Sequence, residues 1–265
     1  MTAATEIPAA ESMPPDFGQL VGELDWIIFD ALASQPRSLQ TRIGPSEIGI
    51  PCARRIGYKL AGVAPVNDRG VPWKPFIGTS VHAMLAEIFA RFNRANDPDD
   101  PRFLIEHKVD VGEVAGEIID GSCDLHDTLT RTVIDWKIVG KDQLAKYRKN
   151  GPGDQYRIQA HTYGRGWERR GYAVDRVAVV FLPRDLEYDK RVVWHEDYDE
   201  QIAIDALTRV NGIAQLVAAA GTGALPLLPT ADAWCAFCPH YLPASTELGD
   251  GCPGHPGSAA RITTT

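Results

Sequence analysis

The side chains best suited to chemistry lie in a short run of β-branched and aromatic residues at 132–138, which predicts a strand. Because side chains alternate along a strand, Asp135 and Lys137 share one face, while Ile134 and Trp136 share the other. A carboxylate and an ammonium group set into an apolar strand are costly unless they meet a partner, a metal or a substrate. A surface ion pair on an edge strand is the simpler interpretation of this stretch taken alone.

A second carboxylate comes from the preceding stretch at 116–127, which also predicts a strand. A tight turn at 128–131 would join the two strands into a hairpin whose open end sets Asp124 beside Asp135. Two neighbouring carboxylates repel each other, and a divalent cation is the usual remedy. Since carboxylate oxygens select Mg²⁺ or Mn²⁺ rather than zinc, the pair predicts a site for one of these ions.

The charge distribution favours an anionic partner near this site, although the whole chain carries a net charge of −8. Residues 1–30 hold six acids and no Lys or Arg, whereas residues 137–170 hold nine basic residues against three acids. Local charge governs the attraction of phosphates. A solvated helix face is the alternative, but the run begins at Lys137 and therefore predicts a DNA groove. The basic residues expected to bind DNA are Lys141, Lys146, Arg148, Lys149 and Arg157.

Four short motifs, in order along the chain, resemble those of one nuclease family. The pattern Gly121-x-x-Asp124, followed by Asp-Trp-Lys at 135–137, is similar to the core of the PD-(D/E)xK nucleases in their RecB-like form. That family also carries a helical Gly-x-x-x-His before the core and a helical Gln-x-x-x-Tyr after it. The same patterns stand here at residues 78–82 and 159–163. Each motif alone is weak, but four in this order make a specific resemblance.

The resemblance implies a restriction-endonuclease-like α/β fold, with a mixed central sheet flanked by helices, and metal-dependent exonucleolytic hydrolysis of single-stranded DNA ends. Lys137 would orient the attacking water, while Gln159 and Tyr163 would position the strand. The expected catalytic residues are Lys137, Asp124, Asp135, Gln159 and Tyr163. The expected ligands of Mg²⁺ or Mn²⁺ are His82, Asp124, Asp135 and the backbone carbonyl of Trp136. A short nuclease of this kind suits phage recombination, replication or repair, or CRISPR adaptation, with proteins of those systems as partners.

Four of the five cysteines form a second pattern. Cys235 and Cys238 make a C-x-x-C pair, Cys252 follows, and Cys52 stands far upstream. Disulfides are not expected in a cytoplasmic chain, and this layout suits a metal or a cluster. Cys52, followed by two arginines and an aromatic, resembles the first cluster ligand of the iron–sulfur RecB-type exonucleases, which include the CRISPR-adaptation exonucleases and the AddB nuclease domain. The resemblance implies a structural 4Fe–4S cluster held by all four.

Zinc is the main alternative for these cysteines, because thiolate ligation suits both a zinc ion and an iron–sulfur cluster. In a zinc site, His240 or His255 could replace a cysteine. The fifth cysteine, Cys123, is interpreted as a core residue whose side chain points away from Asp124.

Periodicity predicts the elements that must hold these groups. Helices are predicted at 16–33, 75–95, 154–171 and 199–220, and a short helix near residue 44 has Ser46 as its expected N-cap. Further strands are predicted at 103–111, 177–182 and 187–194, the second of them buried on both faces. Glu106 and Asp120, within predicted strands, are interpreted as solvated or supporting groups.

The expected organisation has five parts: a disordered tail at 1–15, a helical region at 16–74 that carries Cys52, a nuclease core at 75–221, an iron–sulfur C-terminal cap at 222–256 and a disordered tail at 257–265. No segment looks long and apolar enough to cross a bilayer, and residues 1–30 lack a signal-peptide pattern. A soluble, cytoplasmic protein without a membrane partner is therefore expected.

Two other classes of function fit less of the sequence. One is a catalytically silent or partner-dependent DNA-binding module with a structural zinc or iron–sulfur site, against which the intact Asp124, Asp135 and Lys137 speak. The other is an iron–sulfur electron-transfer or radical protein, which the absence of a clustered C-x-x-x-C-x-x-C run disfavours. The chain carries no P-loop, so any unwinding of DNA would come from another protein.

Overall fold

The computed structural model describes residues 15–33, 42–67, 70, 72–232 and 234–258. The chain divides into two compact units, Met1–Gln40 with Arg69–Phe76 and Thr41–Asp68 with Ile77–Thr265. The smaller unit contains helix α1 (Pro15–Ala33), which confirms the helix predicted at 16–33. The sheet, the motif residues and the four cysteines all belong to the larger unit. The tails predicted at 1–15 and 257–265 lie almost wholly outside the described residues.

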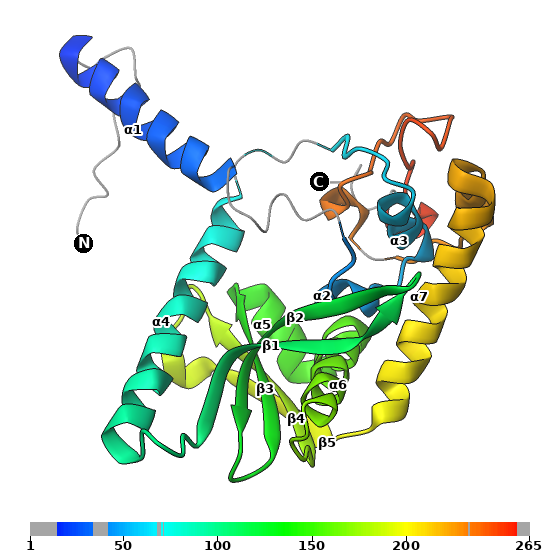
Figure 1. Cartoon of the computed structure of the whole chain (residues 1–265). Helices are drawn as coiled ribbons and strands as arrows, with labels where there is room; N and C mark the ends of the chain where they lie inside the picture. Colours follow the sequence, from blue (N-terminus) through cyan, green and yellow to red (C-terminus); the bar gives the residue numbers. More distant parts are fainter. Residues whose placement is uncertain (1–14, 34–41, 68–69, 71, 233, 259–265) are drawn as a thin grey trace. The chain divides into compact units, whose positions relative to one another are not determined.

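The larger unit is built on a five-stranded mixed sheet (Figure 1). Its strands, in spatial order, are β1 (Phe103–Val114), β2 (Glu117–Asp127), β3 (Thr132–Val139), β4 (Arg176–Pro183) and β5 (Val192–Asp197). Neighbouring strands are antiparallel except β3 and β4, which are parallel. The parallel pair needs a crossover, and helices α5 (Lys141–Asn150) and α6 (Gly153–Arg169) provide it. The predicted mixed sheet flanked by helices is confirmed.

Helix α6 packs tightly on the sheet because glycine lies at the contact. A Cβ atom at Gly166 would lie 2.6 Å from a methyl carbon of Val109 on β1, closer than real side chains approach. The neighbouring Trp167 is fully buried. Helix α7 (Glu200–Ala220) packs against α6 and against α3 (Ala53–Leu60), which forms the next layer of the unit. This arrangement places the inner face of α6, with its motif residues, directly on the strands.

Helix α7 also corrects one expectation. Together with the turn η4 (Gly221–Leu227), it forms the one segment among the described residues that is long and apolar enough to cross a membrane, with a mean hydropathy of 1.3. The expectation that no segment meets this test is therefore wrong. Apolar side chains of this helix pack in the core of the larger unit, where Leu207, Val210 and Val217 are buried.

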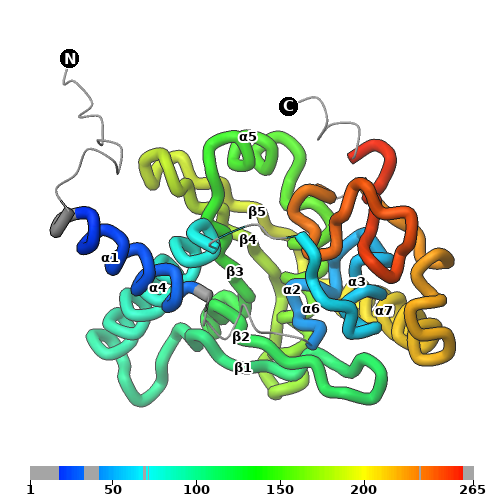
Figure 2. Tube along the Cα trace, turned by 90° about the horizontal axis from the view of Figure 1, so that it is seen from above, coloured from blue at the N-terminus to red at the C-terminus, as the bar shows by residue number. Residues whose placement is uncertain are grey.

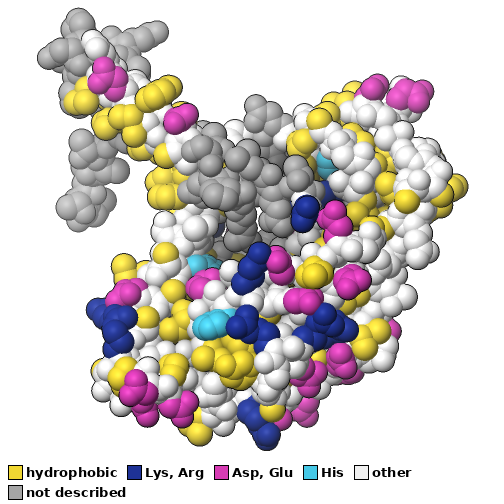
Figure 3. All heavy atoms as spheres, in the orientation of Figure 1, with side chains coloured by type: hydrophobic (Ala, Val, Ile, Leu, Met, Phe, Trp, Pro, Cys, Tyr) yellow, Lys and Arg dark blue, Asp and Glu magenta, His cyan; other side chains and the backbone are white. Residues whose placement is uncertain are grey.

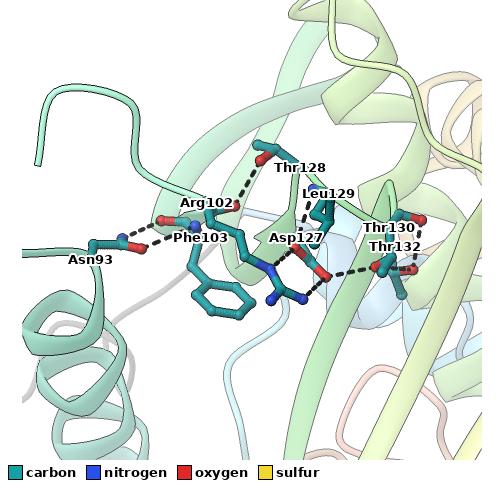
Figure 4. A network of polar contacts seen from close by, with 8 residues as sticks. All are labelled: Asn93, Arg102, Phe103, Asp127, Thr128, Leu129, Thr130 and Thr132. Carbon is teal, nitrogen blue, oxygen red and sulfur yellow. Dashed lines mark hydrogen bonds and ion pairs between the residues drawn. The ribbon is translucent and has the colours of Figure 1, made fainter. Parts of the chain in front are cut away.

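A polar network holds the turn of the β2–β3 hairpin (Figure 4). Asp127 accepts hydrogen bonds from the Arg102 guanidinium at 2.7 and 2.8 Å and from the Thr130 hydroxyl at 2.7 Å. Burial raises the pKa of Asp127, but these partners outweigh it and bring the pKa below its ordinary value. On helix α4 (Trp73–Asn96), Asn93 bonds to both the N–H and the C=O of Phe103. The network thus ties β1, the hairpin and α4 together and helps to fix strand register.

Three of the element boundaries that differ from the prediction have a clear local cause. Helix α2 (Pro45–Ile48) is capped by Gly44 rather than Ser46, because Pro45 pre-sets the first helical position and the Glu47 side chain accepts from the Gly44 N–H. Strand β1 continues past residue 111 to Val114 through a bulge next to Gly112, whose φ of 138° a strand pattern does not predict. Strand β5 starts at Val192 because residues 188–190 form the turn η3 (Tyr188–Lys190).

Candidate active site and cysteine cavity

Three acidic residues lie in a row across β1, β2 and β3. The β2–β3 ladder ends at Leu125 and Ile134, so Asp124 and Asp135 are the next facing residues, where the strands separate. On the other side of Asp124, the β1–β2 register places Glu106 opposite it. Glu106 has a left-handed backbone conformation, with φ 51°, which is uncommon outside glycine.

Asp124 ties the sheet to helix α4. One carboxylate oxygen lies 3.1 Å from Nδ1 of His82, and the other accepts a hydrogen bond from the backbone N–H of Trp136 at 2.7 Å. Burial lowers the pKa of His82, but Asp124 and Asp135 outweigh it and raise this pKa above its ordinary value. The structure therefore brings His82 and Asp124 together by geometry and by charge.

Asp135 is almost completely buried, with 3% of its surface exposed. Its Oδ2 lies 2.8 Å from Nζ of Lys137, and its Oδ1 accepts a hydrogen bond from Nε2 of Gln159 at 2.9 Å. Burial raises the pKa of Asp135 to about 6, opposed by Lys137 and reinforced by Asp124. A divalent cation beside the two carboxylates would relieve this unfavourable ionisation, so the charges present fit a metal ion.

The alternation predicted for β3 is confirmed. Lys137 shares a face with Asp135, and its ammonium group lies 4.9 Å from the centre of the Tyr156 ring of α6. On the opposite face, Trp136 stacks on Phe89 of α4, with 5.8 Å between ring centres. Asp135 and the Tyr156 ring hold the Lys137 side chain in place. The side chain is 16% exposed, so it still reaches the surface of the site.

Pro45, and behind it Tyr163, account for the glycine of the Gly-x-x-Asp motif. A Cβ atom at Gly121 would lie 2.8 Å from Pro45 and 3.4 Å from the Tyr163 hydroxyl. Burial and the nearby Asp135 raise the pKa of Tyr163 well above its ordinary value, so the phenol stays neutral. The Pro45 ring occupies most of the space that a side chain at residue 121 would need, and the Tyr163 hydroxyl borders it.

His82, Glu106 and Asp124 form the one group of three mutually close metal-ligand residues in the described part of the chain. Their ligand atoms all lie within 4.8 Å of one another, and two carboxylates in the group suit Mg²⁺ or Mn²⁺. Asp135, expected as a direct ligand, is outside this group, since Lys137 and Gln159 engage its oxygens.

Glu106 is the functional candidate that sequence reasoning set aside as solvated. Its position opposite Asp124 would have identified it, but that position depends on the register of β1 against β2. Asp120, set aside on the same grounds, is half exposed and pairs with Lys108 at 2.9 Å. Both residues are exposed, as the interpretation as solvated groups requires, but the strand register also brings Glu106 close to Asp124.

The basic residues predicted to bind DNA divide into two groups. Lys141 and Lys149 on α5 are exposed. Figure 3 shows one face of the molecule, on which basic side chains are interspersed with acidic ones. The others have protein partners: Arg157 pairs with Glu196 at 2.5 Å, Arg148 donates to the carbonyl of Lys190 at 2.6 Å, and Lys146 lies over the ring of Trp234. The Arg157 charge is thus neutralised by a carboxylate, whereas α5 remains basic.

The four cysteines of the second pattern line one small cavity. Cys52 precedes α3, Cys235 and Cys238 bound the turn η5 (Cys235–Phe237), and Cys252 pairs with Tyr241 in a short β-bridge. Backbone N–H groups donate to the sulfurs of Cys235 and Cys252 at 3.3 and 3.4 Å. The fold therefore gathers residues separated by about two hundred positions around one space.

Other details of this cavity bear on its ligand. No three of its four sulfur atoms, all of which are described, lie mutually within 4.8 Å. His255 lines the cavity, whereas His240 stacks on Tyr58 with 4.7 Å between ring centres and is not among the lining residues. Cys123 is buried elsewhere, within β2, as its interpretation as a core residue requires.

Comparisons with known proteins show structural likeness at low sequence identity. No protein-family model matches the chain, and no curated protein matches it significantly. The alkaline exonuclease LHK-Exo from Laribacter hongkongensis has a TM-score of 0.43 at 15% identity, covering 73% of this chain and 93% of that chain.

Two further solved structures resemble the chain in the same way. SSO0001 has a TM-score of 0.47 at 15% identity, covering 87% of this chain and 95% of that chain. A phage related exonuclease from Haemophilus somnus 129PT has a TM-score of 0.33 at 14% identity, covering 56% and 71%. Each TM-score is below 0.5, so the activity has to be inferred from the site itself.

Proposed function

We propose that this protein hydrolyses phosphodiester bonds of DNA with the help of Mg²⁺ or Mn²⁺. The observation that carries the proposal is the position of the His82, Glu106 and Asp124 group beside the buried pair of Asp135 and Lys137. A cationic side chain next to a carboxylate metal site suits a phosphate, whose charge the ion and the ammonium group would share.

Each of these residues has a defined task in the proposed reaction. His82, Glu106 and Asp124 would bind the ion, with Asp135 and the carbonyl of Trp136 as further ligands. When bound, a divalent ion polarises a phosphoryl oxygen and lowers the pKa of water. Lys137 would orient the attacking water and stabilise the negative charge that grows on the phosphate.

Gln159 and Tyr163 support the site from α6. The prediction gave both residues the task of positioning the DNA strand, but Gln159 donates its hydrogen bond to Asp135. We therefore assign Gln159 to the orientation of this carboxylate, with the neutral phenol of Tyr163 packed behind it. A fixed carboxylate keeps the ligand geometry ready before the substrate arrives.

The proposal includes a 4Fe–4S cluster held by Cys52, Cys235, Cys238 and Cys252. A tetrahedral zinc ion would hold its four thiolates roughly 3.8 Å apart, given Zn–S distances of about 2.3 Å. A 4Fe–4S cluster would hold the thiolates further apart, and four cysteines around one cavity can ligate either group. Its role would be structural, joining the Cys52 segment to the C-terminal segment, with zinc as the alternative.

Attack on single-stranded DNA ends is the most specific part of the proposal. It follows from the resemblance to RecB-like nucleases, and the basic helix α5, which begins just after Lys137, supports a path for the DNA backbone. Recombination, replication, repair or CRISPR adaptation would supply such ends, and partner proteins would separate the strands.

Cleavage of end-labelled and circular single-stranded DNA with Mn²⁺, by anaerobically purified protein, tests this function. Wild type should release labelled nucleotides and spare circles. Lys137→Gln should lower the rate by at least about 100-fold, the scale expected for losing a charge-stabilising group. Lys108→Gln is the matched control, because this exposed lysine on β1 pairs with Asp120 and should be dispensable.

Other outcomes would redirect the assignment. Cleavage of circles would indicate an endonuclease with the same site. DNA binding without cleavage by wild type would favour a silent or partner-dependent binding module. A brown protein without any DNase activity would favour electron transfer.

A further inference from the structure

Two large aromatic side chains are exposed on the segment that carries the C-terminal cysteines. Trp234 is 55% exposed and Phe237 is 44% exposed, and their rings meet edge to face with 5.8 Å between centres. Trp234 also has a left-handed backbone conformation, with φ 53°, which is unfavourable for a bulky residue. The backbone of Trp234 is therefore strained while its indole ring is exposed. Strained residues of this kind are found at functional positions.

A basic helix lies beside this aromatic pair. The ammonium group of Lys146 on α5 lies 5.6 Å from the centre of the Trp234 ring, and Figure 2 shows α5 next to the C-terminal segment. Helix α5 carries Lys141, Lys146, Arg148 and Lys149 against the single acid Asp142. Aromatic faces beside a cationic helix match a ligand that has both flat rings and negative charges.

We propose that Trp234 and Phe237 form a platform on which bases of single-stranded DNA stack while α5 binds the phosphates. This inference rests on the proposed nuclease function and extends it by naming a subsite for the substrate. Stacking on aromatic side chains together with a basic groove is how proteins bind single strands without reading sequence. Bases inside a duplex are already stacked on one another, so the platform selects an unpaired strand.

The charge around the platform favours nucleic acid over an apolar protein partner. A hydrophobic docking surface needs apolar neighbours, whereas the side chain over Trp234 is an ammonium group and the adjoining helix is basic. Trp234 remains 55% exposed beside this ammonium group, so indole surface is available to a base.

The test is a binding cycle with two oligonucleotides in the presence of EDTA, which prevents cleavage. Full-length protein is titrated into a labelled oligothymidylate and into a strand of equal length that consists of abasic sites, and anisotropy gives each Kd. Trp234→Leu removes the aromatic face and keeps the apolar bulk, while Trp234→Phe keeps a ring. The iron content per chain of every variant is measured to confirm that the cysteine cavity is intact.

Trp234→Leu should weaken oligothymidylate binding by about 5- to 150-fold, the range for losing one stacked base. It should leave binding of the abasic strand unchanged, and Trp234→Phe should retain most of the affinity. Equal losses on both strands, or wild-type affinity in Trp234→Leu, would overturn the platform, and the second result would point to a protein-docking surface. Either failure would leave the nuclease proposal standing if wild type still cleaves DNA, whereas no binding and no cleavage by wild type would refute the nuclease proposal itself.

Discussion

At the scale of single residues, Glu106 is the residue that the structure adds to the proposed metal site. Its carboxylate lies within 4.8 Å of the ligand atoms of His82 and Asp124, so in the proposed site it would be a ligand in addition to Asp124 and Asp135. The two carboxylate oxygens of Asp135 already contact Lys137 and Gln159, so Asp135 mainly contributes negative charge to the site.

Replacing Glu106 by Gln should therefore weaken metal binding. The Mn²⁺ concentration for half-maximal cleavage should rise by at least about tenfold, which is the lower end of the effect of removing even a supporting partner of a metal ligand. Glu113→Gln, on the exposed side of the same strand, should leave this concentration unchanged. An unaltered Mn²⁺ requirement in Glu106→Gln would remove Glu106 from the site.

His161 gives a stability prediction that depends on pH. The fully buried imidazole bonds to Glu196 through Nε2 and accepts from the Asp199 N–H through Nδ1, so it is neutral. Burial lowers its pKa below the ordinary 6.5, and Glu196 only partly opposes this shift. Because the unfolded chain then binds more protons than the folded chain, stability should fall as the pH drops through the ordinary value towards the folded one.

Urea unfolding in EDTA at about pH 7.5 and about pH 5.5 measures this effect. His161→Gln, which can still donate to Glu196, should lose less stability between the two pH values than wild type does. Part of the dependence should remain, because burial also lowers the pKa of His126 and of His240. An identical pH dependence in wild type and His161→Gln would show that His161 does not contribute.

At the scale of elements, the contact between α6 and β1 positions the site. Gly166→Ala should destabilise the fold by about 1–3 kcal/mol, because the added methyl group overlaps with Val109. Gly212→Ala on α7 is the matched control, since no described atom lies within 4 Å of its added methyl group, and a helical glycine-to-alanine change there should stabilise by up to about 1 kcal/mol. Urea unfolding that ranks Gly166→Ala at or above wild type would contradict the packing described.

The sequence predicts best the elements that have a clear pattern of apolar residues. Helices α4, α6 and α7 and the buried strand β4 follow from apolar spacing, and the four motifs place His82, Asp124, Asp135 and Lys137 on the right elements. The bulge at Gly112, the turn at 188–190 and the approach of Glu106 to Asp124 depend on strand register and tertiary contacts, which single-sequence periodicity does not contain. The partners of Lys137, such as Tyr156, were missed for the same reason.

At the scale of the whole larger unit, the cysteine cavity joins distant parts of the chain. Cys252→Ala should lower the iron content and the thermal midpoint of unfolding. The site exists only in the folded chain, so binding of the proposed cluster stabilises the folded state. Cys123→Ala, at the buried fifth cysteine in β2, should keep the iron while still costing some core packing. Full iron content in Cys252→Ala would exclude Cys252 as a ligand.

If the carboxylates on β2 and β3 support metal-dependent cleavage of DNA, two aspartates of β2 should contribute very differently to it. The measurement is the rate of Mn²⁺-dependent cleavage of single-stranded DNA by Asp124→Asn and by Asp120→Asn. Asp120 pairs with Lys108 at the surface, whereas Asp124 bonds to His82 and to the Trp136 N–H. We expect a loss of at least about 100-fold for Asp124→Asn and a wild-type rate for Asp120→Asn. Equal cleavage rates in the two variants would contradict it.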